Sequence, residues 1–169
     1  MALLRATRSL APDGMQVEIF EGLGQLPLFN PDLEPQAPAS VRALWEAVTA
    51  ADAVLICSPE YAHGVTGTIK NTLDWLVGHI PFANKPVAVF NPAWESHHAD
   101  DALRETLRMM SAELIADACV RIPVIGARLD QAGIEASPEH APLIRAALRA
   151  IAGHGEFANR GGVDTVLPP

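Results

Sequence analysis

The chain has 169 residues, of which 49% are hydrophobic and 19% charged, and this composition is typical of a globular domain rather than of a disordered chain. Its formal net charge of -8 opposes binding to a phosphate backbone, and no run of Lys and Arg interrupts the acidic balance locally. We therefore expect one domain over residues 1–169, with a flexible tail from 153, and no nucleic-acid partner.

The first third of the chain alternates between helical and extended patterns. The order predicted is helix, strand, surface loop, helix and strand, over residues 2–14, 15–22, 23–40, 41–52 and 53–58. Pro12 and Gly14 mark the end of the first helix, and Ser40 is the expected N-cap of the second. The run AVLICS at 53–58 is apolar throughout, which is typical of a strand covered on both faces.

The same alternation continues to the C-terminus. After a loop at 58–67 we expect helix, strand, helix, strand and helix, over residues 69–77, 85–91, 99–114, 117–126 and 137–151. The last helix opens at Ser137, and its apolar residues recur at helical spacing. Strands that alternate with helices of this length predict a mainly parallel sheet with helices on both faces, an open three-layer α/β sandwich.

The loop Ser58–Gly67 joins a strand to a helix, and in such sheets ligands bind at the carboxyl ends of the strands. Pro59 has no N–H and turns the chain out of the sheet, so Glu60 and Tyr61 are expected to project near a crevice. Gly64 allows backbone to approach a ligand closely. From composition alone, an ordinary connector explains this loop as well as a ligand site does.

The order of residues in the loop favours a ligand site. The stretch PEYAHG at 59–64, followed by Gly67 and by IKNTLDWL at 69–76, resembles the signature of the NADPH-dependent FMN reductase family. That family is flavodoxin-like and includes quinone, azo-dye and chromate reductases. The resemblance extends more loosely from residue 2 to about 151.

The resemblance implies a non-covalent FMN that NADPH or NADH reduces and that a quinone, azo compound or similar acceptor reoxidises. Both the nicotinamide cofactor and the acceptor stay open at this point. It implies no catalytic side chain, because hydride transfer is the chemistry of the cofactors. It also implies a homodimer or homotetramer. The residues that the resemblance places at the flavin are Pro59, Glu60, Tyr61, Ala62, His63, Gly64, Ala93 and Trp94. Ala62 stands where the motif often has Asn, the Ala93–Trp94 loop departs from the family pattern, and Trp94 could either cover the flavin or simply pack.

The beginning of the chain departs from the family pattern. Members begin with an apolar strand and a Gly-Ser-x-Arg, Ser, Asn loop that holds the FMN phosphate. Residues 1–5, MALLR, instead match the interior of the helix that follows this loop. We therefore expect the first strand to be missing and FMN to bind weakly or not at all. A misplaced start codon is the favoured explanation; a true truncation and rescue by rearrangement or by another chain are the alternatives.

Two hypotheses from other classes stay open. A flavin-free, inactive flavodoxin-like interaction module would explain the absent phosphate loop. A metal-assisted hydrolase using His97, His98 and Asp100 ranks last, because adjacent histidines at a helix start are more often simply exposed. We therefore nominate no metal ligands.

Cys57 and Cys119 both lie in apolar runs that predict strands. A disulfide between neighbouring strands is possible, but buried free thiols are favoured and suit a reducing compartment. With neither a secretory leader nor an apolar run long enough to span a bilayer in the sequence, we expect a cytoplasmic protein.

Overall fold

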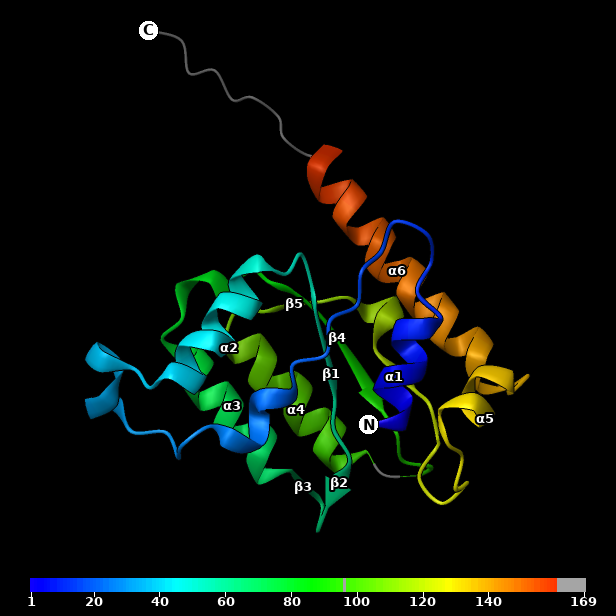
Figure 1. The fold of residues 1–169 in the computed structure, drawn as a ribbon, viewed down its shortest axis with the longest axis horizontal. Helices are drawn as coiled ribbons and strands as arrows, with labels where there is room; N and C mark the ends of the chain where they lie inside the picture. The colour runs from blue at the N-terminus through cyan, green and yellow to red at the C-terminus, as the bar shows by residue number, and fades with distance from the viewer. Residues whose placement is uncertain (96, 161–169) are drawn as a thin grey trace, which may run out of the picture.

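The computed structural model describes residues 1–95 and 97–160, and a short parallel sheet lies at its centre (Figure 1). β1 (Val54–Cys57) pairs in parallel with β4 (Pro86–Asn91). On its other side β4 pairs first with β5 (Glu113–Leu114) and then with β6 (Val120–Arg121), both also parallel. Among the described residues β1 has no strand on its second edge. The predicted parallel sheet is thus confirmed, with β4 as its central strand.

Helices cover both faces of this sheet, as Figure 1 shows. One face carries α2 (Ala39–Ala50), α3 (Gly67–Val77) and α4 (His98–Met109). The opposite face carries α1 (Ala2–Ser9), α5 (Gln131–Ala136) and α6 (His140–Arg160). The result is the predicted three-layer sandwich.

Alternation along β4 explains why there are two separate cores. Val87 and Val89 pack among the residues of α2, α3 and α4, whereas Ala88 and Phe90 pack among those of α1, α5 and α6. Successive side chains of a strand point to opposite faces, so a strand buried on both sides is apolar at every position. All four side chains are at most 1% exposed.

The strand expected at 15–22 is wrong. Residues 15–20 form no regular element, and the 3-10 helix η1 (Glu21–Gln25) follows them directly. Met15 and Val17 pack against one core and Phe20 against the other, so the alternating pattern is used for packing. A strand also needs a neighbour for its backbone groups, and none pairs with this segment in the described chain.

Other element boundaries also differ from expectation. The proline-rich stretch contains η1 and a second 3-10 helix, η2 (Pro31–Gln36), and is therefore not wholly irregular. Ser40 lies inside α2, whose N-cap is Pro38. The strand expected at 117–126 is reduced to β6, because the 3-10 helix η4 (Ala116–Ala118) comes first.

The later helices depart from expectation at their ends. α4 ends at Met109, because Ser111 adopts a positive φ of 59° and turns the chain into β5. α5 was not expected at all. α6 continues to Arg160, beyond the helix end expected at residue 151. The flexible tail expected from 153 stays a prediction, and its residues 161–169 lie outside the described residues.

Both cysteines are free. Cys57 in β1 lies opposite Phe90 of β4, and Phe90 in turn lies opposite Val120 of β6, so a whole strand separates the two cysteines. This arrangement confirms free thiols over a disulfide. Within the described residues, no helix combines the length and the apolarity needed to cross a membrane.

Burial raises the pKa of the Cys57 thiol from 9.0 to about 11. We therefore expect the free energy of unfolding to decline as pH rises from 9 to about 11, because the thiol ionises first in the unfolded chain. Below pH 9 both states keep the proton and the contribution is fully present. At pH 10 the loss should be about 1.4 kcal/mol. Urea unfolding of Cys57→Ala should show a shallower alkaline decline than the wild type; equal slopes would refute this.

Candidate active site

A two-stranded hairpin follows β1 at the carboxyl edge of the sheet. β2 (Glu60–Tyr61) and β3 (Gly64–Val65) are antiparallel, with Glu60 opposite Val65 and Tyr61 opposite Gly64. The two turn residues, Ala62 and His63, have φ angles of 49° and 60°. Positive φ at both central residues defines a two-residue turn of type I′, whose usual sequences are Asn-Gly and Asp-Gly. The absence of such a signal is why the sequence indicated a loop here.

This turn is strained at Ala62, because a left-handed backbone brings Cβ close to the following carbonyl oxygen. Asn tolerates that conformation better than Ala does. We expect Ala62→Asn to raise the free energy of unfolding by about 1 kcal/mol, measured by urea denaturation. Ala102→Asn on the exposed face of α4 is the matched control and should lower stability by about 0.5 kcal/mol. A destabilising effect of Ala62→Asn would show that the turn is not strained.

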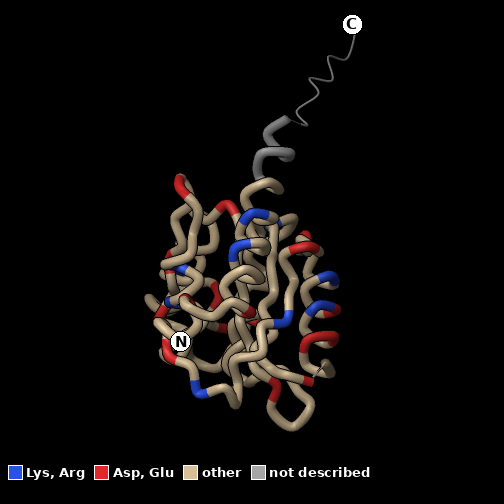
Figure 2. The backbone as a smooth tube through the Cα atoms, turned by 90° about the vertical axis from the view of Figure 1, so that its right-hand side faces the viewer, with Lys and Arg blue, Asp and Glu red and all other residues tan. Residues whose placement is uncertain are grey.

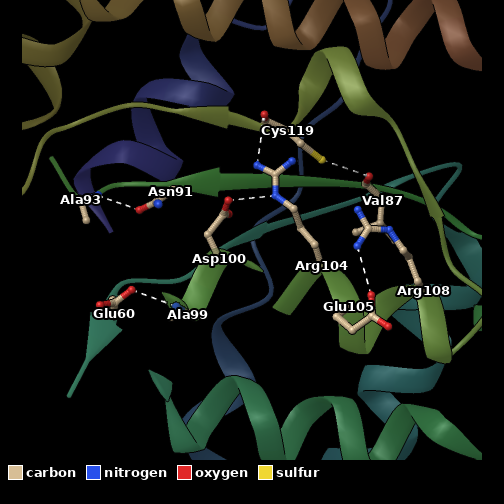
Figure 3. Close-up of polar contacts among 10 residues, drawn as sticks. All are labelled: Glu60, Val87, Asn91, Ala93, Ala99, Asp100, Arg104, Glu105, Arg108 and Cys119. Carbon is tan, nitrogen blue, oxygen red and sulfur yellow. Dashed lines mark hydrogen bonds and ion pairs between the residues drawn. The ribbon is translucent and has the colours of Figure 1, made fainter. Parts of the chain in front are cut away.

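The hairpin is fastened to the start of α4. The backbone N–H of Ala99 donates to Oε2 of Glu60 at 2.9 Å (Figure 3). His97, the N-cap of α4, makes no side-chain capping bond. The carboxylate of Glu60, 39 residues before Ala99 in the chain, caps the helix instead. A carboxylate is favoured there, because the first N–H groups of a helix are unpaired and carry partial positive charge.

A second loop reaches the same edge from the end of β4. Asn91 is 5% exposed, and its Oδ1 accepts a hydrogen bond from the backbone N–H of Ala93 at 3.0 Å (Figure 3). Nη1 of Arg121, at the end of β6, donates to the carbonyl oxygen of Trp94 at 3.2 Å. Sequence reasoning missed Arg121, and it included Asn91 in the loop that leads to Ala93 and Trp94 without giving it a separate role. The available signal was a polar residue at the last position of each apolar strand.

The structure therefore places all the sequence-predicted site residues on two loops at one edge of the sheet. Pro59 follows β1, and residues 60–64 form most of the hairpin. Tyr61 is 70% exposed and Trp94 is 65% exposed, whereas Ala93 is buried beneath its loop. Both large aromatic side chains are thus open to a ligand at this edge.

α1 begins beside the same edge. The Met1 ammonium lies close enough to the Cys57 thiol to counteract part of the effect of burial on the Cys57 pKa. The first turn of α1 contains no acidic residue and no side-chain cap.

Two surface hollows lie elsewhere. One, of about 500 Å³, is bordered by the ends of α3 and α4, and the other, of about 400 Å³, lies on α2 next to His79. Neither includes the hairpin or the Ala93–Trp94 loop. The candidate site is therefore defined by sheet topology and polar contacts, at an open edge.

The metal hypothesis gains no support from the geometry. In the described part of the chain, no group of three or more His, Cys, Asp or Glu side chains is arranged to hold a metal ion. Oδ2 of Asp100 accepts from Nε of Arg104 at 2.9 Å, and Nη2 of Arg104 donates to the carbonyl oxygen of Cys119 at 3.3 Å (Figure 3). Asp100 thus helps to join α4 to the strand layer.

Charge does not mark out the candidate site. In the view of Figure 2, Lys and Arg residues are scattered among acidic ones. Selectivity at this edge would therefore come from shape, exposed aromatic groups and backbone donors.

Comparison with known proteins gives a consistent result. A family model described as NADPH-dependent FMN reductase matches residues 1–124. The quinone reductase of Escherichia coli K12 is 37% identical over 89 residues, which cover 50% of this chain and 47% of that protein. An NAD(P)H-dependent FMN reductase of Pseudomonas aeruginosa is 34% identical over 112 residues, with 63% and 60% covered. The chain thus spans about half the length of the curated relatives it matches most strongly.

A solved structure extends the likeness over more of the chain. It is FerB, a flavoenzyme NAD(P)H:(acceptor) oxidoreductase from Paracoccus denitrificans, with a TM-score of 0.80 and 25% identity. The match covers 92% of this chain and 88% of FerB. It confirms the predicted flavodoxin-like sandwich.

Proposed function

The chain belongs to the NADPH-dependent FMN reductase family, and from that premise we propose that it is an NAD(P)H-dependent oxidoreductase. It binds FMN at the hairpin edge and passes electrons to a quinone or a similar small acceptor. The observation that carries the proposal is the hairpin itself. Its signature residues, 59–64, lie at the carboxyl edge of the parallel sheet and are fixed there by the bond between Glu60 and Ala99.

FMN supplies the redox chemistry when bound, since its ring accepts hydride from a nicotinamide and passes the electrons on. The residues of this chain then position the flavin ring and shield it. Pro59 fixes the backbone where it leaves β1, and Tyr61 presents an exposed aromatic face. Ala93 and Trp94 border the opposite side of the edge, on a loop that Asn91 and Arg121 hold.

No side chain needs to act as an acid or base in this scheme. The Glu60 carboxylate already accepts a hydrogen bond from the Ala99 amide, so its role is to hold the hairpin.

The test is a titration of the purified chain with FMN, followed by flavin fluorescence, and then an assay of NADPH and NADH oxidation with a benzoquinone. We expect saturable quenching and turnover that depends on both FMN and protein. A folded chain that leaves FMN fluorescence unchanged, and oxidises NAD(P)H no faster than free FMN does, would overturn the proposal. That result would favour an interaction module instead.

The remaining expectations from the family are also proposals. A homodimer or homotetramer would cover the hollow between α3 and α4, which Lys70 and Asp74 border and where Val77, Ile80 and Met109 are between 66% and 85% exposed. Light scattering at micromolar concentration would measure the mass. Two free thiols fit a reducing compartment, and we place the protein in the cytoplasm on that basis.

A further inference from the structure

Three histidine rings from two elements form a continuous stack beside the candidate site. His63 belongs to the turn of the hairpin, His98 is the first residue of α4, and His97 precedes it. The ring centroids of His63 and His98 are 4.3 Å apart with 24° between their planes, and those of His97 and His98 are 4.3 Å apart with 29°. All three side chains are exposed. We call these three residues the histidine stack.

The histidine stack joins the hairpin to α4, as does the hydrogen bond from the Ala99 amide to Glu60. Glu60 thus joins β2, and His63 joins the turn of the hairpin, to the first turn of α4. The hairpin needs such support because its turn is strained, with positive φ at both Ala62 and His63.

Protonation would oppose this attachment. Imidazole takes up a proton between pH 8 and pH 5, and two exposed cations about 4 Å apart repel each other by about 1 kcal/mol in water. His97 and His98 also lie at the positive end of α4, which disfavours added positive charge. The neutral histidine stack is therefore the form that holds the hairpin.

Nearby acidic groups only partly offset this repulsion. Glu60 is engaged with the Ala99 amide, and Asp100 is paired with Arg104. The exposed carboxylates of Glu95 and Asp101 face water, which screens them. Among the described residues no acidic group forms an ion pair with the histidine stack. Of the nearby cations, Arg104 of α4 is paired with Asp100, and Arg121 of β6 donates to the carbonyl oxygen of Trp94.

We propose that His63, His97 and His98 are positioning residues that hold the flavin-facing hairpin on α4 while neutral and release it when they take up protons. FMN affinity should consequently fall as pH drops below neutrality. The part of this proposal that concerns affinity rests on the proposed function, whereas the release of the hairpin can be measured without any flavin.

The test compares the wild type with His63→Asn and His98→Asn at pH 7.5 and pH 5.5. Asn tolerates the positive φ of position 63, so the first variant removes the imidazole without adding strain to the turn. His154→Gln is the matched control, since His154 of α6 is paired with Glu113 of β5, away from the hairpin. The first readout is amide hydrogen exchange of Ala99 and residues 60–65 in the free chain, corrected for intrinsic exchange rates. The second is the FMN Kd.

In the wild type and in His154→Gln, we expect hairpin protection to fall, and the FMN Kd to rise, about tenfold from pH 7.5 to pH 5.5. In His63→Asn and His98→Asn both changes should shrink to about twofold or less. An undiminished pH response in these two variants would overturn the proposal, even if FMN binds well. Failure to bind FMN at either pH would refute the proposed function, and the exchange data would still decide the role of the histidine stack.

Discussion

Replacing Trp75 with alanine is expected to lower the free energy of unfolding by about 3–5 kcal/mol, the largest effect of any single change considered. Trp75 lies in α3, and its side chain is fully buried. Nε1 donates to the carbonyl oxygen of Pro27 at 2.8 Å, and the ring meets Phe29 edge-on at a centroid distance of 5.0 Å. Trp75 thus ties the long segment between α1 and α2 to the helix that follows the hairpin.

Two further variants separate the contributions at Trp75. Trp75→Phe keeps most of the apolar volume and removes only the Nε1 hydrogen bond, since the Pro27 carbonyl still accepts from Nδ2 of Asn71 at 2.9 Å. The lost bond should cost about 0.5–1.5 kcal/mol. Trp94→Ala is the control, because that side chain is 65% exposed and should change stability by less than about 0.5 kcal/mol. Urea unfolding followed by circular dichroism measures all three. Equal losses at Trp75 and Trp94 would contradict the packing described.

Replacing Glu60 with alanine is expected to raise the Kd for FMN by about tenfold or more, because a hydrogen bond to a charged group contributes about 1.5–3 kcal/mol. Without the carboxylate, the Ala99 amide loses its partner, and the hairpin loses this hydrogen bond to α4 while the stacking of His63 on His98 remains. Glu60→Gln keeps an acceptor oxygen and should give an intermediate Kd.

The control for Glu60 is Glu105→Gln. Glu105 also lies in α4, but its Oε2 accepts a hydrogen bond from Nη1 of the exposed Arg108 at 3.3 Å. We expect the FMN Kd of Glu105→Gln to match that of the wild type within about twofold. Urea unfolding of each variant shows whether a change in affinity follows from general destabilisation. An unaltered Kd in Glu60→Ala would remove Glu60 from the site.

The central strands and the helices that cover them could be predicted from the sequence, because burial leaves a distinct pattern of apolar residues. β1 and β4 are apolar at consecutive positions, and α3 and α4 repeat apolar residues at helical spacing. For the segment at 15–20 the same reasoning predicted a strand that the structure does not contain. Alternation records which side chains are buried, whereas a strand also requires a partner for its backbone, and no local pattern supplies that information.

The candidate site was predictable in position but not in detail. Pro59 at the end of an apolar run placed residues 59–64 at the ligand edge. The contact from Glu60 to Ala99 and the stacking of His63 on His98 join residues 39 and 35 positions apart. Such contacts depend on how the hairpin folds back over α4, and the Ala-His turn carried no conventional hairpin signal.

The central claim is that FMN binds at the edge formed by the hairpin and the Ala93–Trp94 loop. Backbone amide spectra recorded by NMR during an FMN titration test it most directly. We expect the largest shift changes at residues 60–64, 93 and 94. Changes centred instead on the hollow between α3 and α4, or no saturable change at all, would contradict the claim.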